Sequence, residues 1–302
     1  MKQSIIFYVL FFFFFVTGIS RSAEISEGDV AFARKNYEAA LELYSAAREL
    51  YAARQNQKDK DNDWKRLTVQ IIRCCLVRGE SERAVQEYFL LCRVEPFPPL
   101  EWIPLPWFVP TGTAMGMGLR EKTAENWLDP LQTQSPGLAA TLLAAAILSV
   151  SLDPAKQSRG YQLLRNLEKK LETTKKAQDQ ESIFQHQVAL LAAALCWKQR
   201  IPTLKNPTAL IPLRHILDQI PEEPYRAGPL FLFGRAARMV GDHETAVLAW
   251  MRIPILYSEN TLLVVEALRE AALSLEKLGR FDQAERLRTE LLQTELLQTK
   301  RL

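Results

Sequence analysis

Apolar residues recur at intervals of three and four along almost the whole chain, and the alternating patterns typical of strands are scarce. Helix start and stop signals fall between these segments. Asp153 precedes Pro154, which pairs a capping oxygen with a proline suited to a first helical turn. Gly79, Gly241 and Gly279 stand where helices are expected to end. The pattern predicts an all-α protein.

Two stretches without charge, 138–150 and 188–197, are rich in alanine and leucine. Both are shorter than the ~20 residues that a membrane-spanning helix needs. Their small side chains let neighbouring helices approach closely. We therefore predict two fully buried core helices.

The beginning of the chain has the composition of a secretory signal peptide. Lys2 leads into an apolar run from Ile5 to Ile19, which is too short to span a bilayer and is followed by small residues. We predict that the signal peptide is residues 1–23, with cleavage between Ser20 and Glu24. The mature protein is then expected to be exported without a transmembrane span. No asparagine is a glycosylation acceptor, because the one N-x-Thr triplet, at Asn206, has Pro207 in its middle; this favours a bacterial periplasm or envelope.

Composition narrows the class of partner. The chain has 38 Lys and Arg against 35 Asp and Glu, a formal charge of +3, and loses two of these cations with the predicted signal. Such a near-neutral balance gives no reason to expect nucleic acid or a polybasic membrane anchor. Four cysteines would meet an oxidising compartment, but their positions on the predicted helices favour buried free thiols: Cys74, Cys75, Cys92 and Cys196.

A helix, a tight turn and a second helix with alanine and an aromatic residue at fixed offsets occur four times. The units contain Gly28, Tyr37, Ala40, Tyr44 and Ala47; Gly79, Ala84, Tyr88 and Leu91; Gly234, Gly241, Ala246 and Trp250; and Ala272, Gly279, Phe281, Ala284 and Leu291. This pattern resembles the tetratricopeptide repeat (TPR) family. The resemblance implies an α-solenoid of antiparallel helical hairpins whose small residues permit close helix approach.

The resemblance divides the chain unevenly. TPR-like hairpins are expected in 24–96 and 228–302, with turns 44 residues apart in the first block and 38 in the second, against a family period of 34. Residues 119–227 are predicted to be degenerate helical hairpins that continue the solenoid; a separate inserted helical domain is the alternative.

Between these blocks, residues 97–118 form a predicted connector rich in proline, glycine and aromatic residues. Six prolines fall in the 15 residues 96–110, which cannot form an α-helix. Trp102, Trp107 and Phe108 either cover neighbouring helices or offer an extended aromatic surface to a partner. The first interpretation is favoured because large aromatic residues usually fill cores.

Catalytic signatures are missing from the sequence: it has no phosphate-binding loop, no dinucleotide fingerprint, and no HExxH, GxSxG or Cys-x-x-Cys motif. The three histidines, His186, His215 and His243, are scattered over predicted helices. The carboxylate pair Glu222-Glu223 lies in a proline-flanked loop and is expected to be solvated. We therefore expect no catalytic residue, no metal and no cofactor.

The TPR resemblance implies that the first helix of each hairpin lines a concave surface that binds peptides or proteins. Carrying over those positions one by one gives six candidate partner-binding residues: Asp29, Phe32, Arg73, Arg235, Arg238 and Arg269. Arginine recognises carboxylates, so an acidic or C-terminal peptide is the expected ligand. Alternatively, these arginines solvate helix faces or pair with nearby glutamates.

The sequence therefore predicts an exported, non-enzymatic scaffold or adaptor of the cell envelope. The Lys and Asn pattern of the family's carboxylate clamp is not reproduced. Two other functions stay open, a glycan-active or glycan-binding envelope protein and a self-assembling structural repeat protein.

Overall fold

The computed structural model describes residues 26–52, 60–108, 114–129, 137–171, 179–221 and 224–299. All regular elements in these ranges are helical, which confirms the predicted all-α class. A short helix over 26–33 comes first. The α-helices that follow are α2 (Tyr37–Ala52), α3 (Lys60–Arg78), α4 (Ser81–Val94), α5 (Ala114–Leu128), α6 (Leu138–Leu148), α7 (Pro154–Glu168), α9 (Gln180–Arg200), α10 (Ile211–Gln219), α11 (Ala227–Met239), α12 (His243–Leu256), α13 (Thr261–Lys277) and α14 (Phe281–Thr299).

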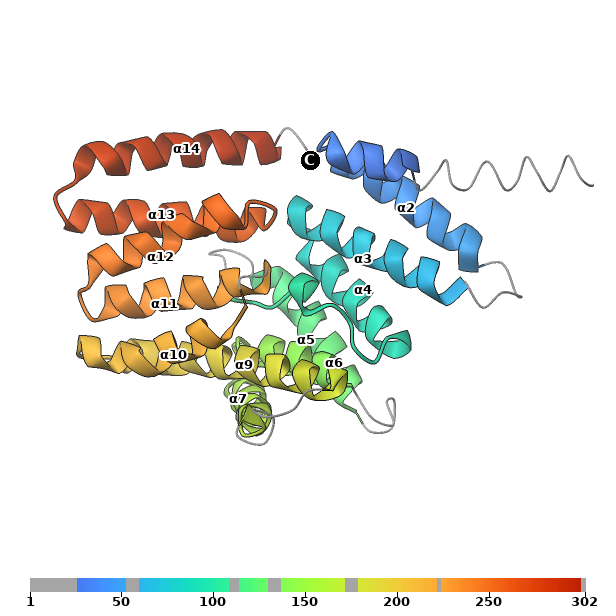
Figure 1. Cartoon of the computed structure of the whole chain (residues 1–302), viewed down its shortest axis with the longest axis horizontal. Coiled ribbons are helices and arrows are strands. Elements are labelled where there is room, and N and C mark those ends of the chain that lie inside the picture. The colour runs from blue at the N-terminus through green and yellow to red at the C-terminus, as the bar shows by residue number, and fades with distance from the viewer. Residues whose placement is uncertain are drawn as a thin grey trace, which may run out of the picture.

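The helices form two sides joined at one end (Figure 1). One side runs from α2 through α6, and the other runs back from α10 to α14. Helices that follow one another in sequence pack against each other along both sides, as in α2 with α3 and α12 with α13. Helices α7 and α9 lie at the joined end.

Four turns between consecutive helices share one backbone geometry. Their central residues, Lys35, Gly79, Gly241 and Gly279, have φ of 61°, 78°, 82° and 73°. In each turn the next residue donates its N–H to the carbonyl oxygen five residues earlier, as Asn36 does to Ala31 at 2.9 Å. This is the Schellman ending, which satisfies carbonyls left open at a helix C-terminus. The predicted turn positions are confirmed.

The second helix of each of these hairpins carries the predicted small residue at the same offset. Ala40, Ala84, Ala246 and Ala284 all have 0% exposure. An aromatic residue four positions later fills the space beside the first helix in three hairpins: Tyr44, Tyr88 and Trp250. Glycine is required opposite two of them. A Cβ on Gly28 would lie 2.7 Å from the Tyr44 ring, and one on Gly234 would lie 2.5 Å from Trp250.

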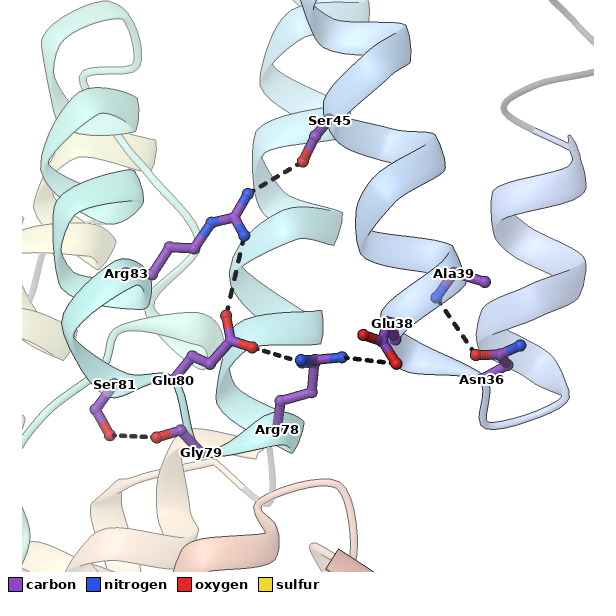
Figure 2. Close-up of polar contacts among 9 residues, drawn as sticks. All are labelled: Asn36, Glu38, Ala39, Ser45, Arg78, Gly79, Glu80, Ser81 and Arg83. Atoms are coloured by element: carbon purple, nitrogen blue, oxygen red, sulfur yellow. Dashed lines mark hydrogen bonds and ion pairs between the residues drawn. The ribbon is translucent and has the colours of Figure 1, made fainter. Parts of the chain in front are cut away.

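Polar side chains connect the first two hairpins along their turns (Figure 2). Arg78 bonds Glu80 at 2.5 Å and lies 4.0 Å from Glu38 on α2, while Arg83 donates to Ser45 at 3.2 Å. The hydroxyl of Ser81, at the start of α4, donates to the carbonyl of Gly79.

The two uncharged stretches are buried as predicted. Nine of the eleven residues of α6 are buried, and α9 is buried continuously over 188–197. Gly160 on α7 lets that helix cross the end of α6 closely, because a Cβ there would lie 2.4 Å from the backbone nitrogen of Ser149. Asp153 caps α7 by accepting the N–H of Ala155 at 2.8 Å, as its position before Pro154 predicts.

The four cysteines are free, and three of them are buried: Cys74, Cys75 and Cys196. Cys92 is partly buried. Burial raises the pKa of each thiol to about 12.

The connector ends earlier than its composition suggests. Helix α5 begins at Ala114, so the last five residues of the predicted connector, 114–118, are helical. The prolines stop at Pro110, and the glycines beyond it weaken a helix without forbidding it. A single turn of 3-10 helix, η1 (Leu100–Trp102), is the regular element in the described part of the connector, 97–108.

The two sides of the molecule touch each other where α3 meets α13. The hydroxyl of Thr261, the first residue of α13, donates to the carbonyl of Val77 near the end of α3 at 3.1 Å. Arg73 on α3 pairs with Glu259, just before α13, at 3.1 Å. We call this contact the α3–α13 seam. It joins segments more than 180 residues apart in the sequence.

Candidate functional site

A cavity of about 570 Å³ lies beside the α3–α13 seam. Its walls come from α3, α4, the connector, Arg120 of α5, the end of α6 and the turn between α12 and α13. Both blocks that carry the repeat pattern therefore contribute to one concave space. Its volume is in the range of small-molecule and peptide-side-chain pockets. We call it the central cavity.

The connector provides the aromatic part of the cavity wall. Trp107 is buried against α11 beside Gly228. A Cβ at residue 228 would lie only 1.9 Å from the indole of Trp107, so residue 228 must be glycine. Phe108 packs on Phe231 of α11, with ring centroids 5.7 Å apart. Trp102 is only partly buried. For Trp107 and Phe108, the prediction that the connector covers neighbouring helices is confirmed.

Arg73 is the one sequence-predicted residue that lines the central cavity. Its guanidinium lies between the rings of Phe32 and Trp102, 4.6 Å from each centroid. It also donates to Gln70 at 3.1 Å and to both carboxylate oxygens of Glu259. These contacts stabilise the seam and use both terminal nitrogens of the guanidinium, while its Nε is buried without a partner.

Arg120 is a second arginine in the cavity wall, and it differs from Arg73 in its bonding. It has no hydrogen bond or ion pair within the described residues, and its Nε is buried without a partner. Burial lowers the pKa of its guanidinium, and the nearby Glu82 opposes that effect. A half-buried guanidinium without a partner favours an anionic ligand group. Sequence analysis did not find Arg120, because one charge on a helix has no periodic signature.

The other predicted residues lie outside the cavity and mostly have partners. Asp29 accepts the hydroxyl of Tyr44 at 2.7 Å and pairs with Arg66 at 3.1 Å. Arg238 pairs with Glu270 on α13. Each contact joins two helices, so these side chains hold the hairpins together.

Two further arginines complete the set. Arg269 pairs with Glu266 on its own helix, three residues away, as the alternative of pairing with a nearby glutamate predicts. Arg235 has no ion pair or hydrogen bond within the part of the chain that the structure describes. Of the six predicted residues, the structure brings only Phe32 and Arg73 into contact.

Other chemistry is sparse in the described residues. They contain no group of three or more His, Cys, Asp or Glu side chains placed to hold a metal ion. Among the described helices, none is long and apolar enough to cross a bilayer. The predicted signal peptide, 1–23, and the carboxylate pair Glu222-Glu223 lie outside the described residues.

No protein-family model matches the chain, and a comparison with curated proteins finds no match.

Proposed function

We propose that the chain is an exported, non-catalytic binding protein of the cell envelope, and that a peptide segment of a partner protein occupies its central cavity. One observation carries the proposal. The N-terminal block, the C-terminal block and the connector all contribute walls to one cavity of about 570 Å³. Proteins built from helical hairpins bind partners on such concave surfaces.

The architecture proposed for this function is a TPR-like α-solenoid with degenerate central hairpins. Its support is the turn shared by four hairpins, each followed by a fully buried alanine. The central helices give further support, because α5 with α6, α6 with α7, and α7 with α9 each pack as sequence neighbours. Neighbour-to-neighbour packing is what a stack of hairpins requires.

The walls of the cavity suggest the chemistry of the peptide. Trp102, Trp107 and Tyr257 offer aromatic surface to apolar side chains, and Arg120 offers guanidinium donors that have no partner among the described residues. A partner segment with apolar residues beside a carboxylate fits both features. The proposed compartment rests on the sequence of residues 1–23.

The test uses a variant that fills the cavity mouth without disturbing the core. Ser258 lines the cavity and is exposed, so Ser258→Trp adds bulk where no packed neighbour must move. Ser158→Trp is the matched control, because Ser158 is an exposed serine on α7, outside the cavity. The chain from Glu24 onward would be immobilised, and retained envelope proteins would be identified by mass spectrometry and mapped to peptides.

We expect the parent and Ser158→Trp to bind the same mapped peptide and Ser258→Trp to lose it. Equal binding by all three proteins would contradict the cavity as the site. Retention of glycan strands in place of proteins, or a mass that rises with protein concentration, would favour the two other functions that the sequence left open.

A further inference from the structure

Lys198 and Arg235 lie on neighbouring helices that both contact the connector. Lys198, near the end of α9, donates from Nζ to the carbonyl oxygen of Pro106 at 2.5 Å. Phe108 packs on Phe231, which lies one helical turn before Arg235 on α11. Residues four apart share a helix face, so Arg235 faces the side of α11 that meets the connector. Helices α9 and α11 are themselves in contact.

Neither cation has a counterion within the described residues. Lys198 has one hydrogen-bond partner, a neutral carbonyl, and Arg235 has no hydrogen bond or ion pair. The other three predicted arginines differ, because each pairs with a glutamate: Arg73, Arg238 and Arg269. Lys198 and Arg235 therefore differ from these three arginines in having no carboxylate partner within the described residues.

The two charges affect each other. Burial, and to a smaller extent the positive charge of Arg235, lower the pKa of Lys198 to about 7. Like charges held together away from water are costly, and an anion placed between them removes that cost. Both side chains are only partly buried, so a small anion can reach them from solvent.

We propose that Lys198 and Arg235 form a binding site for an oxyanion, a carboxylate or a phosphate-type group, separate from the central cavity. After the bond to Pro106, the ammonium group keeps two N–H donors, and the guanidinium keeps all five. Neither residue lines the central cavity. The site therefore stands whether or not a peptide occupies that cavity.

The experiment measures thermal unfolding of the purified protein at pH 6, below the lowered pKa of Lys198, during titration with sodium sulfate. Sodium chloride at equal ionic strength corrects for screening. Sulfate also stabilises proteins in general, because it is excluded from their surface. Comparison with variants separates this general effect from binding at Lys198 and Arg235. The variants are Lys198→Met, Arg235→Met and the control Arg214→Met, which removes an exposed arginine of α10.

We expect the parent and Arg214→Met to show saturable stabilisation by sulfate. Lys198→Met and Arg235→Met should require at least about tenfold more sulfate for the same rise in unfolding temperature, because each variant loses one charged donor group. Equal sulfate responses in all four proteins would overturn the proposal, as would no response beyond that to chloride. Repeating the titration with acetate and with inorganic phosphate tells a carboxylate site from a phosphate site.

A measurement on the parent alone covers the case in which a variant does not fold. Sulfate should shift the side-chain carbon resonances next to the ammonium of Lys198 and leave those of the exposed Lys205 unchanged. If the Lys198 resonances do not move over the sulfate range used in the unfolding titration, the anion site is refuted without any substitution.

Discussion

Lys198 makes the stability of the protein depend on pH. Its pKa is about 7 in the folded chain, against an ordinary value near 10.4 when unfolded. Between these values the unfolded chain binds more protons, so the free energy of unfolding rises with pH. We expect Lys198 to add a rise on the order of 1 kcal/mol from pH 7 to 8.5, measured by urea unfolding as the difference between the parent and Lys198→Met.

The matched variants isolate that effect. Lys198→Met should remove the rise, while Lys205→Met, which changes an exposed lysine, should keep it. A pH profile that is the same in the parent and in Lys198→Met would mean that another group titrates. The four cysteines ionise in the unfolded chain near pH 8.5 and oppose the rise, but they are the same in all three proteins and cancel in the comparison.

The cysteine thiols should be chemically silent in the folded protein. Their pKa values of about 12 leave almost no thiolate at neutral pH, and thiolate is the reactive form. We expect a thiol reagent such as Ellman's to react with fewer than one thiol per native chain within minutes and with four in urea. Fast reaction of a native thiol would indicate local opening around α3, α4 or α9.

At the scale of single residues, sequence reasoning succeeded where a periodic pattern existed. Ala40 and Ala246 were found from their offsets to the turns, and both are completely buried. It failed for isolated charges. Arg120 and Lys198 differ from other helical cations only in what lies around them, and that depends on segments far away in the chain.

At the scale of elements, the four turns allow a matched pair of substitutions. Lys35 holds a left-handed conformation at φ 61° that costs a side chain roughly 1 kcal/mol, and Gly279 holds a similar one at φ 73° without that cost. Lys35→Gly should therefore stabilise the protein, and Gly279→Ala should destabilise it, each by about 1 kcal/mol in urea unfolding.

Packing does not complicate the comparison. Lys35 is exposed, and a Cβ on Gly279 would meet nothing within 4 Å. Equal and opposite changes would show that backbone conformation alone sets the cost. No change in either variant would mean that the turns relax, and that the shared geometry contributes little to stability.

Helix positions were largely predictable, while the connector was only partly so. Asp153 and Gly241 mark helix ends by local chemistry that needs no tertiary information. The sequence does not predict the start of α5 at Ala114, because Gly116 and Gly118 have the composition of the proline-rich segment that precedes them. Glycine lowers helix propensity by about 1 kcal/mol, which tertiary packing readily offsets.

At the scale of the whole molecule, one buried hydrogen bond crosses the α3–α13 seam beside the Arg73–Glu259 pair. Thr261→Val keeps the shape of the side chain and removes the donor to Val77, leaving that carbonyl without this partner. We expect a loss of about 1 to 3 kcal/mol in stability. Hydrogen exchange should quicken at the end of α3 and the start of α13 together. Faster exchange on one side alone would contradict a shared seam.

The meeting of the two blocks could not be predicted from the sequence. A repeat pattern specifies how each hairpin packs on the next, but the curvature that brings α3 to α13 is the sum of many small rotations. The central helices lie between the two blocks, and they lack the repeat signature. Arg73 was predicted as a partner-binding residue, yet its bond to Glu259 is visible only once the chain has turned back on itself.

The seam also bears on the order in which the protein can be completed during synthesis. In a simple stack, each hairpin is finished as soon as its neighbour has been made. Here the hydrogen bond to the carbonyl of Val77 cannot form until Thr261 has been translated. The N-terminal block therefore lacks this contact until most of the chain has left the ribosome. A chain truncated after α12 should therefore leave the ribosome with α3 packed on α2 and α4 but with its end lacking the partner across the seam.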